Sequence, residues 1–473
     1  MSTRPAVVIL HYHLRPGGVT RVIERAIESL AGRVDAVLFT SETPASPPVP
    51  RTETFEALGY SERPTTGFET LVEELRHRAR ECLGRDPDVW HVHNHALGKN
   101  SFTPRLVDHL ARSGCRLLLQ PHDFAEDGRP ENYRLLSDHL GDRLQQMLYP
   151  LADHVWYAPI NNRDKAFLSG IGLPHVHELP NAVNAHAVTP PERNAADQKT
   201  IVYPARAIRR KNIGEFLLWS LLTPEGYLFR STLAPRNPRW QEYYNDWIAF
   251  AAELELPVEF DAGRKHDFSR LVQRAEALIT TSIAEGFGLA FLEPWLEGKS
   301  LIGRNLPEIT RDFEAEGLDL SALYDTLPIP LEWLGASRFR QALERAMMQS
   351  YAAYGRAWDR AHLEQAIDAL VIDGQVDFGI LDETMQRDVI RHLVQHPEDR
   401  ARLPEFNPTV DPERIGHNRE IVEKHFSVAA YGERLLHLYQ ELACTAPSRV
   451  GSANAAALLD AFLQPDRFNL LRS

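Results

Sequence analysis

Cysteine is scarce in this sequence, and its three copies lie far apart. Cys82, Cys115 and Cys444 are odd in number and have no metal-ligand spacing, so the sequence predicts neither a disulfide framework nor a cysteine-based zinc site. Secreted domains that lack a large core depend on many disulfides, whereas few cysteines are typical of a reducing compartment. We therefore expect a cytoplasmic protein.

Long apolar runs are also missing. No stretch approaches the roughly 20 residues that a membrane-spanning helix requires. The first five residues pass directly into a strand-like run, without the charged, apolar and small-residue regions of a signal peptide. We expect no transmembrane segment.

Positive charge is in deficit. The 52 basic residues are outnumbered by 65 acidic ones, which gives a formal net charge of −13. A nucleic-acid-binding protein needs a basic face, and anionic lipid surfaces attract clusters of Lys and Arg. We expect neither as a partner. No pattern in the sequence indicates an oligomeric state.

The first part of the chain alternates short apolar runs with amphipathic ones. Residues 19–30 carry apolar side chains at three- and four-residue spacing, which predicts a helix. Strands alternating with helices predict an open parallel sheet covered on both faces. The strand-like runs are 7–11, 34–39, 88–93, 116–122 and 154–159.

A second alternation begins near residue 200, after a polar, proline-bearing run that we interpret as a linker. We predict an α/β protein with two Rossmann-like doubly wound domains, 1–190 and 200–330. Such sheets bind ligands at the carboxyl ends of their strands, so we expect the two domains to face each other across a cleft. The strand-like runs of the second domain are 200–204, 227–233, 258–261, 277–281 and 300–303.

Beyond residue 330 the alternation of strand-like and helical segments stops. Residues 331–415 are charged and helical and show no evident strands, so we predict a helical insertion of unknown role. Residues 416–473 are predicted to form C-terminal helices and a tail, with an amphipathic helix pair at 418–442 that is split near Ser427.

The most informative segment follows the strand-like run 277–281. A loop with Glu285 and Gly288 comes next, and Leu289 onward is predicted to begin a helix that contains Glu293. Glycines at such a turn let backbone N–H groups approach a ligand closely. A helix start adds unpaired donors that suit phosphate or sugar hydroxyls, and a carboxylate can accept two hydrogen bonds from a diol.

Two cations follow the first strand of the second domain. Arg206 and Lys211 are five residues apart at a strand end. A guanidinium can bind two phosphate oxygens at once, and an ammonium group acts as a compact point charge. Such a pair of fixed cations would suit an anionic ligand. We interpret Arg209 and Arg210, between them, as part of a solvated basic turn.

The first domain contributes a Gly17–Gly18 pair after its first strand and several histidines at strand ends. His122 lies where ligands bind in an open sheet. Alternation would place His91, His93 and His95 on one face if their strand extends that far. Imidazole can ligate zinc, but no cysteine or carboxylate completes such a site, so we predict no metal.

These segments, taken in order, resemble the retaining glycosyltransferases of family 4, the group 1 transferases that include glycogen synthase and sucrose-phosphate synthase. The signature is the Glu285–Glu293 pair with Gly-Phe-Gly between. The resemblance covers about residues 5–310 and the helix near 418–442. It implies a GT-B fold, with an acceptor-binding first domain, a nucleotide-sugar-binding second domain, and last helices that cross back to the first.

The resemblance also implies roles for single residues. Arg206 and Lys211 would stabilise the diphosphate, His122 would contact the C6 hydroxyl of the donor sugar, and Glu285 would contact the sugar hydroxyls. Glu293 would hold the ribose. The remaining nucleotide-sugar-binding residues would be Gly17, Gly18, Gly286, Phe287, Gly288 and Leu289, and the acceptor-binding residues would be His93, His95 and Asn181.

The implied reaction is transfer of a hexose from a nucleotide diphosphate sugar, of the UDP-glucose or GDP-mannose type, to an acceptor hydroxyl with retention. It requires no metal and no other cofactor. The leaving phosphate itself would take the proton of the acceptor. Since the chain lacks a basic amphipathic helix, a soluble sugar or small metabolite is favoured over a lipid as acceptor.

Two alternatives stay open. The chain could be a GT-B sugar phosphorylase or nucleotide-sugar epimerase, or a non-catalytic nucleotide-sugar-binding protein. Three departures from the family pattern also bear on the substrate. Ala205 stands where glycine is frequent, Asn181–Ala182 where Asn-Gly is common, and Arg304–Glu308 where a Gly-Gly-x-Pro-Glu run is usual.

Overall fold

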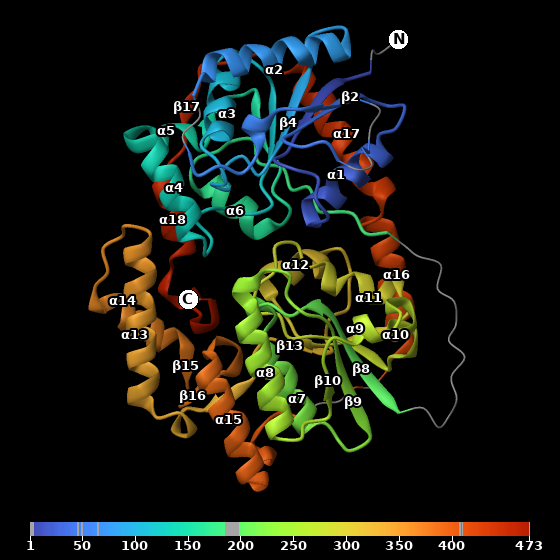
Figure 1. Cartoon of the computed structure of the whole chain (residues 1–473), viewed down its shortest axis with the longest axis vertical. Coiled ribbons are helices and arrows are strands. Elements are labelled where there is room, and N and C mark those ends of the chain that lie inside the picture. The colour runs from blue at the N-terminus through green and yellow to red at the C-terminus, as the bar shows by residue number, and fades with distance from the viewer. Residues whose placement is uncertain are drawn as a thin grey trace. The chain divides into compact units, whose positions relative to one another are not determined.

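The computed structural model describes residues 4–44, 47–48, 51–63, 66–184, 198–405, 408 and 410–472. The chain forms two compact units (Figure 1). The first comprises Met1–Ala182 and His425–Leu463, and the second comprises Val183–Lys424 and Gln464–Ser473. Most of the predicted linker, residues 185–197, lies outside the described residues.

The first unit is built on a six-stranded sheet in the order β3-β2-β1-β4-β5-β7. All of its pairings are parallel, as the alternation predicted. The strand order reverses between β1 and β4, which in an open α/β sheet marks the ligand-binding edge. The strands are β1 (Ala6–Leu10), β2 (Asp35–Thr40), β3 (Thr52–Thr54), β4 (Val89–His93), β5 (Leu117–Gln120) and β7 (Val155–Tyr157).

One face of this sheet is covered by helices from opposite ends of the chain. Helix α1 (Gly18–Ser29) packs beside α17 (Val428–Cys444) (Figure 1). Tyr431, Leu435 and Tyr439 of α17 join the apolar core of this face. Helix α17 is therefore part of the hydrophobic core of the first unit. The other helices of the unit are α2 (Phe68–Leu83), α3 (Phe102–Arg112), α4 (Pro130–Leu140), α5 (Leu144–Met147), α6 (Asn162–Gly170) and α18 (Ala455–Phe462), and a small antiparallel pair joins β6 (Pro150–Leu151) to β17 (Gly451–Ser452).

The second unit repeats the architecture with the order β10-β9-β8-β11-β12-β13. These pairings are also parallel, and the order reverses between β8 and β11. The strands are β8 (Lys199–Arg206), β9 (Tyr227–Leu233), β10 (Val258–Glu259), β11 (Ala277–Thr280), β12 (Ser300–Arg304) and β13 (Leu323–Tyr324); the helices are α7 (Ile213–Leu222), α8 (Gln241–Glu253), α9 (Ala262–Lys265), α10 (Phe268–Arg274), α11 (Glu293–Leu296), α12 (Pro307–Ala315) and α16 (Pro412–His425).

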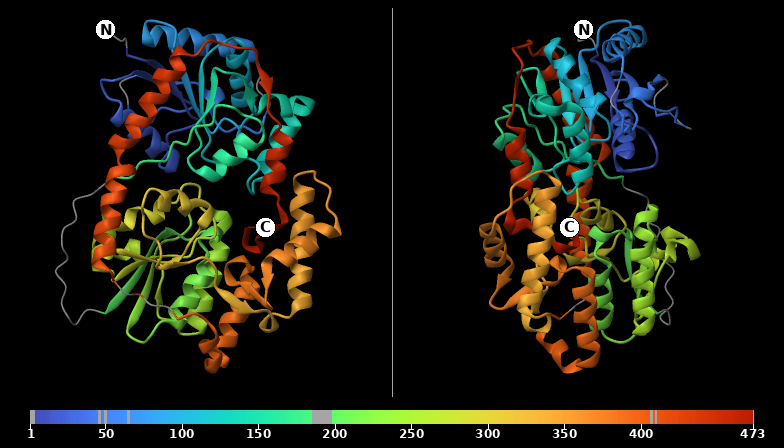
Figure 2. Two further views of the ribbon diagram at one scale, coloured as in Figure 1. Left: turned by 180° about the vertical axis from the view of Figure 1, so that it is seen from behind. Right: turned by 60° about the vertical axis from the view of Figure 1, so that its left-hand side comes forward.

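The inserted segment is mainly helical, and α13 (Ala336–Ala353) lies beside α14 (Arg360–Leu370) (Figure 2). Helix α15 (Glu383–Gln395) follows. The expectation that the inserted segment lacks strands is wrong. Strands β15 (Val371–Ile372) and β16 (Gln375–Asp377) form a hairpin, and β16 pairs with β14 (Pro328–Pro330). Its two-residue turn, Asp373–Gly374, has positive φ at both positions, which is the preference of an Asp-Gly hairpin turn.

The predicted split near Ser427 is confirmed. Helix α16 ends at His425, and the Ser427 side chain accepts a hydrogen bond of 3.3 Å from the Ala430 backbone N–H at the start of α17. A serine at this position satisfies one of the free donors of a new helix. Among the described residues, no helix has the length and apolar character needed to cross a membrane.

Candidate functional site

In the second unit, two loops meet at the carboxyl edge of the sheet. The turn η3 (Arg209–Lys211) follows β8, and the glutamate loop follows β11. Because β8 and β11 are parallel neighbours, their carboxyl ends lie at the same edge. The loops are joined directly, since the Ile283 backbone N–H donates to the Arg210 carbonyl at 2.9 Å.

At this junction Lys211 and Glu285 form an ion pair. The Lys211 ammonium donates to one Glu285 oxygen, and Arg210 Nη1 lies 3.3 Å from the other. Burial opposes the charged carboxylate, but the cations of Lys211 and Arg210 prevail and lower the pKa of Glu285. Burial lowers the pKa of Lys211, although Glu285 and Glu293 favour its charged form. The predicted phosphate and sugar ligands are therefore in contact.

Side-chain hydroxyls hold this turn in place from below. The Lys211 carbonyl accepts hydrogen bonds of 3.0 Å from the Tyr203 hydroxyl and from Thr281 Oγ1. Tyr203 also lies 3.0 Å from Ser282 Oγ, and both residues are buried. Buried, satisfied hydroxyls of this kind fix a backbone geometry. The ammonium group of Lys211 is thus carried by a rigid turn.

Arg206 is the last residue of β8, and its side chain extends toward β9, the neighbour of β8 on the side away from β11. Its guanidinium donates to the Ala234 carbonyl at 2.8 Å, just beyond β9. Partial burial and the nearby cations Arg236 and Arg264 lower its pKa. The two predicted phosphate cations therefore flank the end of β8, one toward β9 and one toward β11.

The glycine loop requires glycine at one position. Gly288 has a φ of +90°, and a Cβ there would lie 2.9 Å from Phe291 Cδ2 and 3.0 Å from Ile309 Cγ2. Leu289 begins a 3₁₀ turn and not the expected α-helix. Glu293 is consequently the first residue of the four-residue helix α11 and not an interior one, because Pro294 suits a helix start and not its interior.

Four other predicted ligands differ in their surroundings. Phe287 is buried, and its ring packs edge-on against Phe313 at 5.4 Å, so it anchors the loop in the core. Gly286 and Leu289 are half-buried within the same loop. Glu293 is exposed. Of these residues, Glu293 is the most exposed to solvent.

In the first unit, histidines from three strand ends gather on the face covered by α1 and α17. His93 Nδ1 lies 2.9 Å from His122 Nε2, and their rings stack at 14° with centroids 5.2 Å apart. The His11 ring is 6.1 Å and the His91 ring 4.3 Å from that of His93. Asn94 Oδ1 accepts a 2.7 Å hydrogen bond from the His122 backbone N–H, which fixes the loop after β5.

These imidazoles are uncharged at neutral pH. Burial lowers the pKa of His11, His91 and His122 to about 3, and that of His93 lies well below its ordinary value. Neutral rings act as hydrogen-bond donors and acceptors, not as anion-binding cations. Among the described residues, no group of three or more His, Cys, Asp or Glu side chains is arranged to hold a metal ion.

His95 does not join this cluster, because the strand does not extend far enough for His95 to share a face with His91 and His93. Strand β4 ends at His93, and Asn94 has a φ of +56°, which breaks the alternation. His95 Nε2 lies 3.0 Å from the Leu148 carbonyl, and its ring meets Tyr149 edge-on. This placement is that of a core histidine.

Asn181, a predicted acceptor-binding residue, and the Gly17–Gly18 pair have different environments. Asn181 is buried, and its Oδ1 has no hydrogen-bond partner within the described part of the chain. Gly17 is extended, with a φ of −172°, and Gly18 begins α1. That geometry does not require glycine at position 17, but it leaves the first N–H groups of a twelve-residue helix at the sheet edge.

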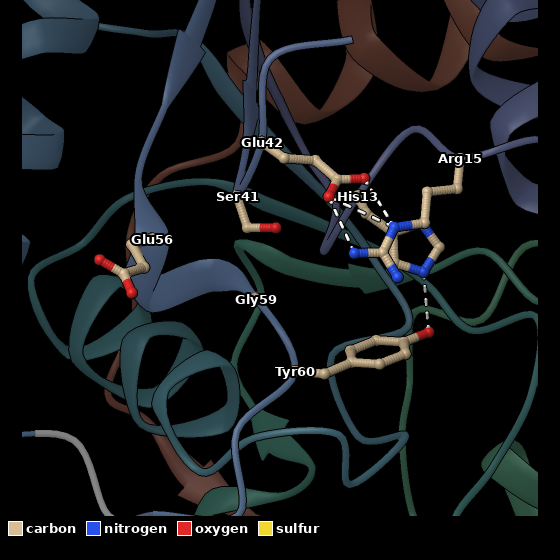
Figure 3. Close-up of a pocket in the computed structure, with 7 residues that line it drawn as sticks. All are labelled: His13, Arg15, Ser41, Glu42, Glu56, Gly59 and Tyr60. Atoms are coloured by element: carbon tan, nitrogen blue, oxygen red, sulfur yellow. Dashed lines mark hydrogen bonds and ion pairs between the residues drawn. The ribbon is translucent and has the colours of Figure 1, made fainter.

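A hollow of about 190 Å³ adjoins this loop (Figure 3). Arg15 forms a bidentate pair with Glu42, and His13 Nε2 lies 3.1 Å from the Tyr60 hydroxyl. Arg15, Glu42 and Tyr60 are not among the residues predicted from the sequence. Only the position of Arg15, two residues before Gly17, could have drawn attention to them. The lining residues are His13, Arg15, Ser41, Glu42, Glu56, Gly59 and Tyr60.

Comparison with known proteins agrees with this architecture. No protein-family model matches the sequence. The chain is 25% identical over 413 residues to the mannosylglucosyl-3-phosphoglycerate synthase of Petrotoga mobilis, covering 80% of this chain and 79% of that one.

Solved structures show the same fold. The Anabaena protein HepE, in complex with UDP and glucose, superposes with a TM-score of 0.54 at 12% identity, covering 92% of this chain and all of that one. A glycosyltransferase from Rickettsia africae gives 0.51 at 12% identity, covering 94% and 100%. The two Rossmann-like sheets thus constitute a GT-B fold. The chain is thus similar in sequence to a mannosylglucosyl-3-phosphoglycerate synthase and similar in fold to these solved structures.

Proposed function

We propose that the protein is a retaining glycosyltransferase of family 4 type that transfers a hexose from a nucleotide diphosphate sugar. The observation that carries this proposal is the junction of Lys211 and Glu285 at the switch point between β8 and β11. A cation and a carboxylate side by side match the two parts of the donor, since the diphosphate is anionic and the sugar is a polyol.

The donor would bind along this edge of the second unit. Lys211 and Arg206 stabilise the negative charge that develops on the departing diphosphate, and the backbone at Gly286–Leu289 supplies further donors. Glu293 accepts hydrogen bonds from the ribose, and Glu285 from the transferred sugar. By the resemblance, neutral His122 is also proposed as a hydrogen-bonding group for the donor sugar. No metal or other cofactor takes part in the proposed reaction.

Retention of configuration is part of the proposal. Glu285 is engaged by Lys211 and Arg210, which stabilises it as a hydrogen-bond acceptor and makes it a poor nucleophile. The acceptor hydroxyl would attack on the face that the diphosphate leaves, and a phosphate oxygen would take its proton. The anomeric proton coupling of the purified product, measured by NMR, distinguishes retention from inversion.

We further propose a soluble small acceptor in the cytoplasm. The name of the Petrotoga mobilis relative specifies a sugar-bearing phosphoglycerate, so glycosides of 3-phosphoglycerate are the first acceptors to test. All three cysteines are free, which fits a reducing compartment. UDP and GDP donors of glucose and mannose make up the first donor panel.

The test is a thermal-shift panel. Ligands that bind the native state raise its melting temperature, so at least one nucleotide diphosphate sugar should stabilise the wild type. Lys211→Ala should lose most of that shift. If no nucleoside diphosphate or its sugar shifts the melting temperature, the transferase proposal fails.

Product analysis separates the alternatives. A phosphorylase would consume inorganic phosphate, and an epimerase would convert one nucleotide sugar into another without any acceptor. Tight binding of a nucleotide sugar without turnover on any acceptor would favour a non-catalytic sensor.

A further inference from the structure

We propose that the inserted segment positions the turn that carries Lys211, with Glu383 and Gln386 of helix α15 as the positioning residues. The inference rests on the proposed function, since it takes Lys211 as a ligand of the donor diphosphate. It assigns a role to a segment that lies outside the resemblance to family 4. Neither residue touches the substrate in this proposal; both act through the turn.

The first link joins α15 to the start of the turn. Arg209 Nε lies 2.6 Å and Nη2 3.0 Å from the two carboxylate oxygens of Glu383. The side chains are 25% and 19% exposed, so the expectation of a solvated Arg209 is wrong. A bidentate pair in a partly buried place has a defined geometry. Arg209 is thus fixed by a residue 174 positions away.

The second link joins α15 to the residue after Lys211. Asn212 is fully buried and has a φ of +51°, a left-handed conformation that asparagine tolerates better than most residues. Gln386 Nε2 donates to Asn212 Oδ1 at 2.9 Å and to the Phe378 carbonyl at 3.2 Å. A Cβ at Gly214 would overlap Gln386 Oε1. The Gln386 side chain therefore packs closely against the start of α7.

A buried charge network connects the insertion to the same helix start. Asn212 Nδ2 donates to Glu215 at 2.7 Å, and Arg304 binds both Glu215 and Asp377 of β16 in bidentate fashion. Arg304 is the residue that replaces a glycine of the family pattern. Its guanidinium leaves no room for a side chain at Gly379. Arg304 therefore connects the small β14-β16-β15 sheet to the six-stranded sheet of the second unit.

The C-terminal residues cover the same region. The turn η10 (Leu470–Arg472) packs against η3 and against η7 (Phe378–Ile380). Asn469 Nδ2 donates to the Gly379 carbonyl at 3.0 Å, and Leu471 is fully buried. The cationic turn is thus enclosed by elements that follow residue 330.

Charge repulsion explains why such support is needed. Arg209, Arg210 and Lys211 are consecutive cations in one 3₁₀ turn, and like charges this close destabilise a compact turn. Glu383 neutralises the first, and Glu285 is shared by the other two. A site that stabilises charge must be held in place before the reaction. Removing Glu383 takes away the carboxylate that neutralises Arg209 in this turn.

The test compares two ion pairs made by the same helix. Glu383→Gln breaks the pair at the turn. Glu253→Gln breaks the Arg391–Glu253 pair, where N and O are 3.2 Å apart and Glu253 is 54% exposed, away from the turn. UDP and GDP binding is measured by calorimetry, and KM and kcat are measured with the donor that the wild type accepts. Gln386→Leu is a second variant at the turn.

Glu383→Gln should weaken nucleoside diphosphate binding about tenfold and raise the donor KM, while the acceptor KM and the melting temperature stay close to those of Glu253→Gln. Equal binding by wild type, Glu383→Gln and Gln386→Leu would overturn the inference. If the wild type itself binds neither UDP nor GDP, the proposed function fails instead.

A charge exchange gives the rescue. The double variant Arg209→Glu with Glu383→Arg restores an ion pair at the turn, so a positioning role predicts recovery of most of the binding lost in Glu383→Gln. If binding in the double variant stays as weak as in the single one, Arg209 contacts the diphosphate itself and the assignment to α15 is wrong.

Discussion

Lys211 and Glu285 are hydrogen-bonded to each other, although 74 residues separate them in the chain. The groups proposed for diphosphate and sugar therefore neutralise each other in the free protein. A donor that binds here must share or replace this contact. The Lys211 side chain is 13% exposed and that of Glu285 is 9% exposed. The pair therefore reaches solvent at one edge, and protein atoms surround the rest of it.

Glu285→Gln should separate binding from transfer. The amide keeps the size of the side chain but releases Lys211, so affinity for a nucleoside diphosphate should be retained or increase. Hexose transfer should fall by a factor on the order of 10², comparable to the loss of one transition-state contact. Calorimetry with UDP and GDP and initial-rate assays measure the two effects. A parallel loss of both would mean that Glu285 serves only to hold Lys211.

The stability of the first unit should fall as the solution becomes acidic. Folded His11, His91 and His122 have pKa values of about 3 and His95 of about 4, below the value near 6.5 expected when unfolded. The unfolded chain therefore binds more protons between these values. Their contribution is complete above pH 6.5 and is lost as the pH falls toward 4 for His95 and toward 3 for the other three.

Each such histidine should add about 1.4 kcal/mol per pH unit to the slope of the unfolding free energy within that window. Unfolding by denaturant between pH 5 and 7.5 measures the slope, and His91→Gln should reduce it. His437→Gln is the control, since that side chain is 67% exposed. An unchanged slope in His91→Gln would contradict the prediction.

Arg304→Ala should be among the most destabilising single substitutions in the second unit. Burial alone would lower the pKa of Arg304, but Asp377 and Glu215 raise it well above its ordinary value. Its loss leaves Glu215 buried without its cation, which costs about 3–5 kcal/mol. Arg402→Ala breaks the exposed pair with Glu332 and should cost far less, because solvent screens exposed ion pairs. Similar denaturation midpoints for the two variants would refute this reasoning.

Gly288→Ala should damage donor binding beyond its backbone cost. Gly226 has a similar φ of +95°, but a Cβ there meets nothing within 4 Å, so Gly226→Ala measures conformational strain alone, on the order of 1–3 kcal/mol. At Gly288 the new methyl group must also displace Phe291 or Ile309. Nucleotide-sugar thermal shifts should be lost in Gly288→Ala and kept in Gly226→Ala. Equal shifts in both would show that the loop tolerates the methyl group.

The sheet strands could be predicted because their apolar runs are local signals. All strand-like runs identified in the two domains correspond to observed strands. The missed strands lack that signal. Strand β3 has the polar sequence Thr-Glu-Thr, β14 and β16 are three residues long, and β6, β13, β15 and β17 are two residues long. The Asp373–Gly374 turn was the available clue, and it was hidden by the helical, charged sequence around it.

The site could be predicted where topology alone brings residues together. Lys211 and Glu285 follow strands that a doubly wound sheet places side by side, so their strand-end positions were enough. The partner of Arg209 could not be found this way. Glu383 lies in an insertion whose docking depends on side-chain packing, and no periodic pattern encodes that contact. The same reason explains why Arg304 could be recognised as a departure but not as a connection.

The path of the chain has a consequence for protein synthesis. Tyr431, Leu435 and Tyr439 belong to the core of the first unit, yet the ribosome delivers them after residues 183–424 of the second. The N-terminal sheet must therefore emerge with part of one apolar face uncovered and wait for about 240 further residues, roughly 12–48 seconds at 5–20 residues per second. Chaperone dependence should accordingly concentrate on the nascent N-terminal half, and a version that supplies α17 directly after Ala182 should need less assistance.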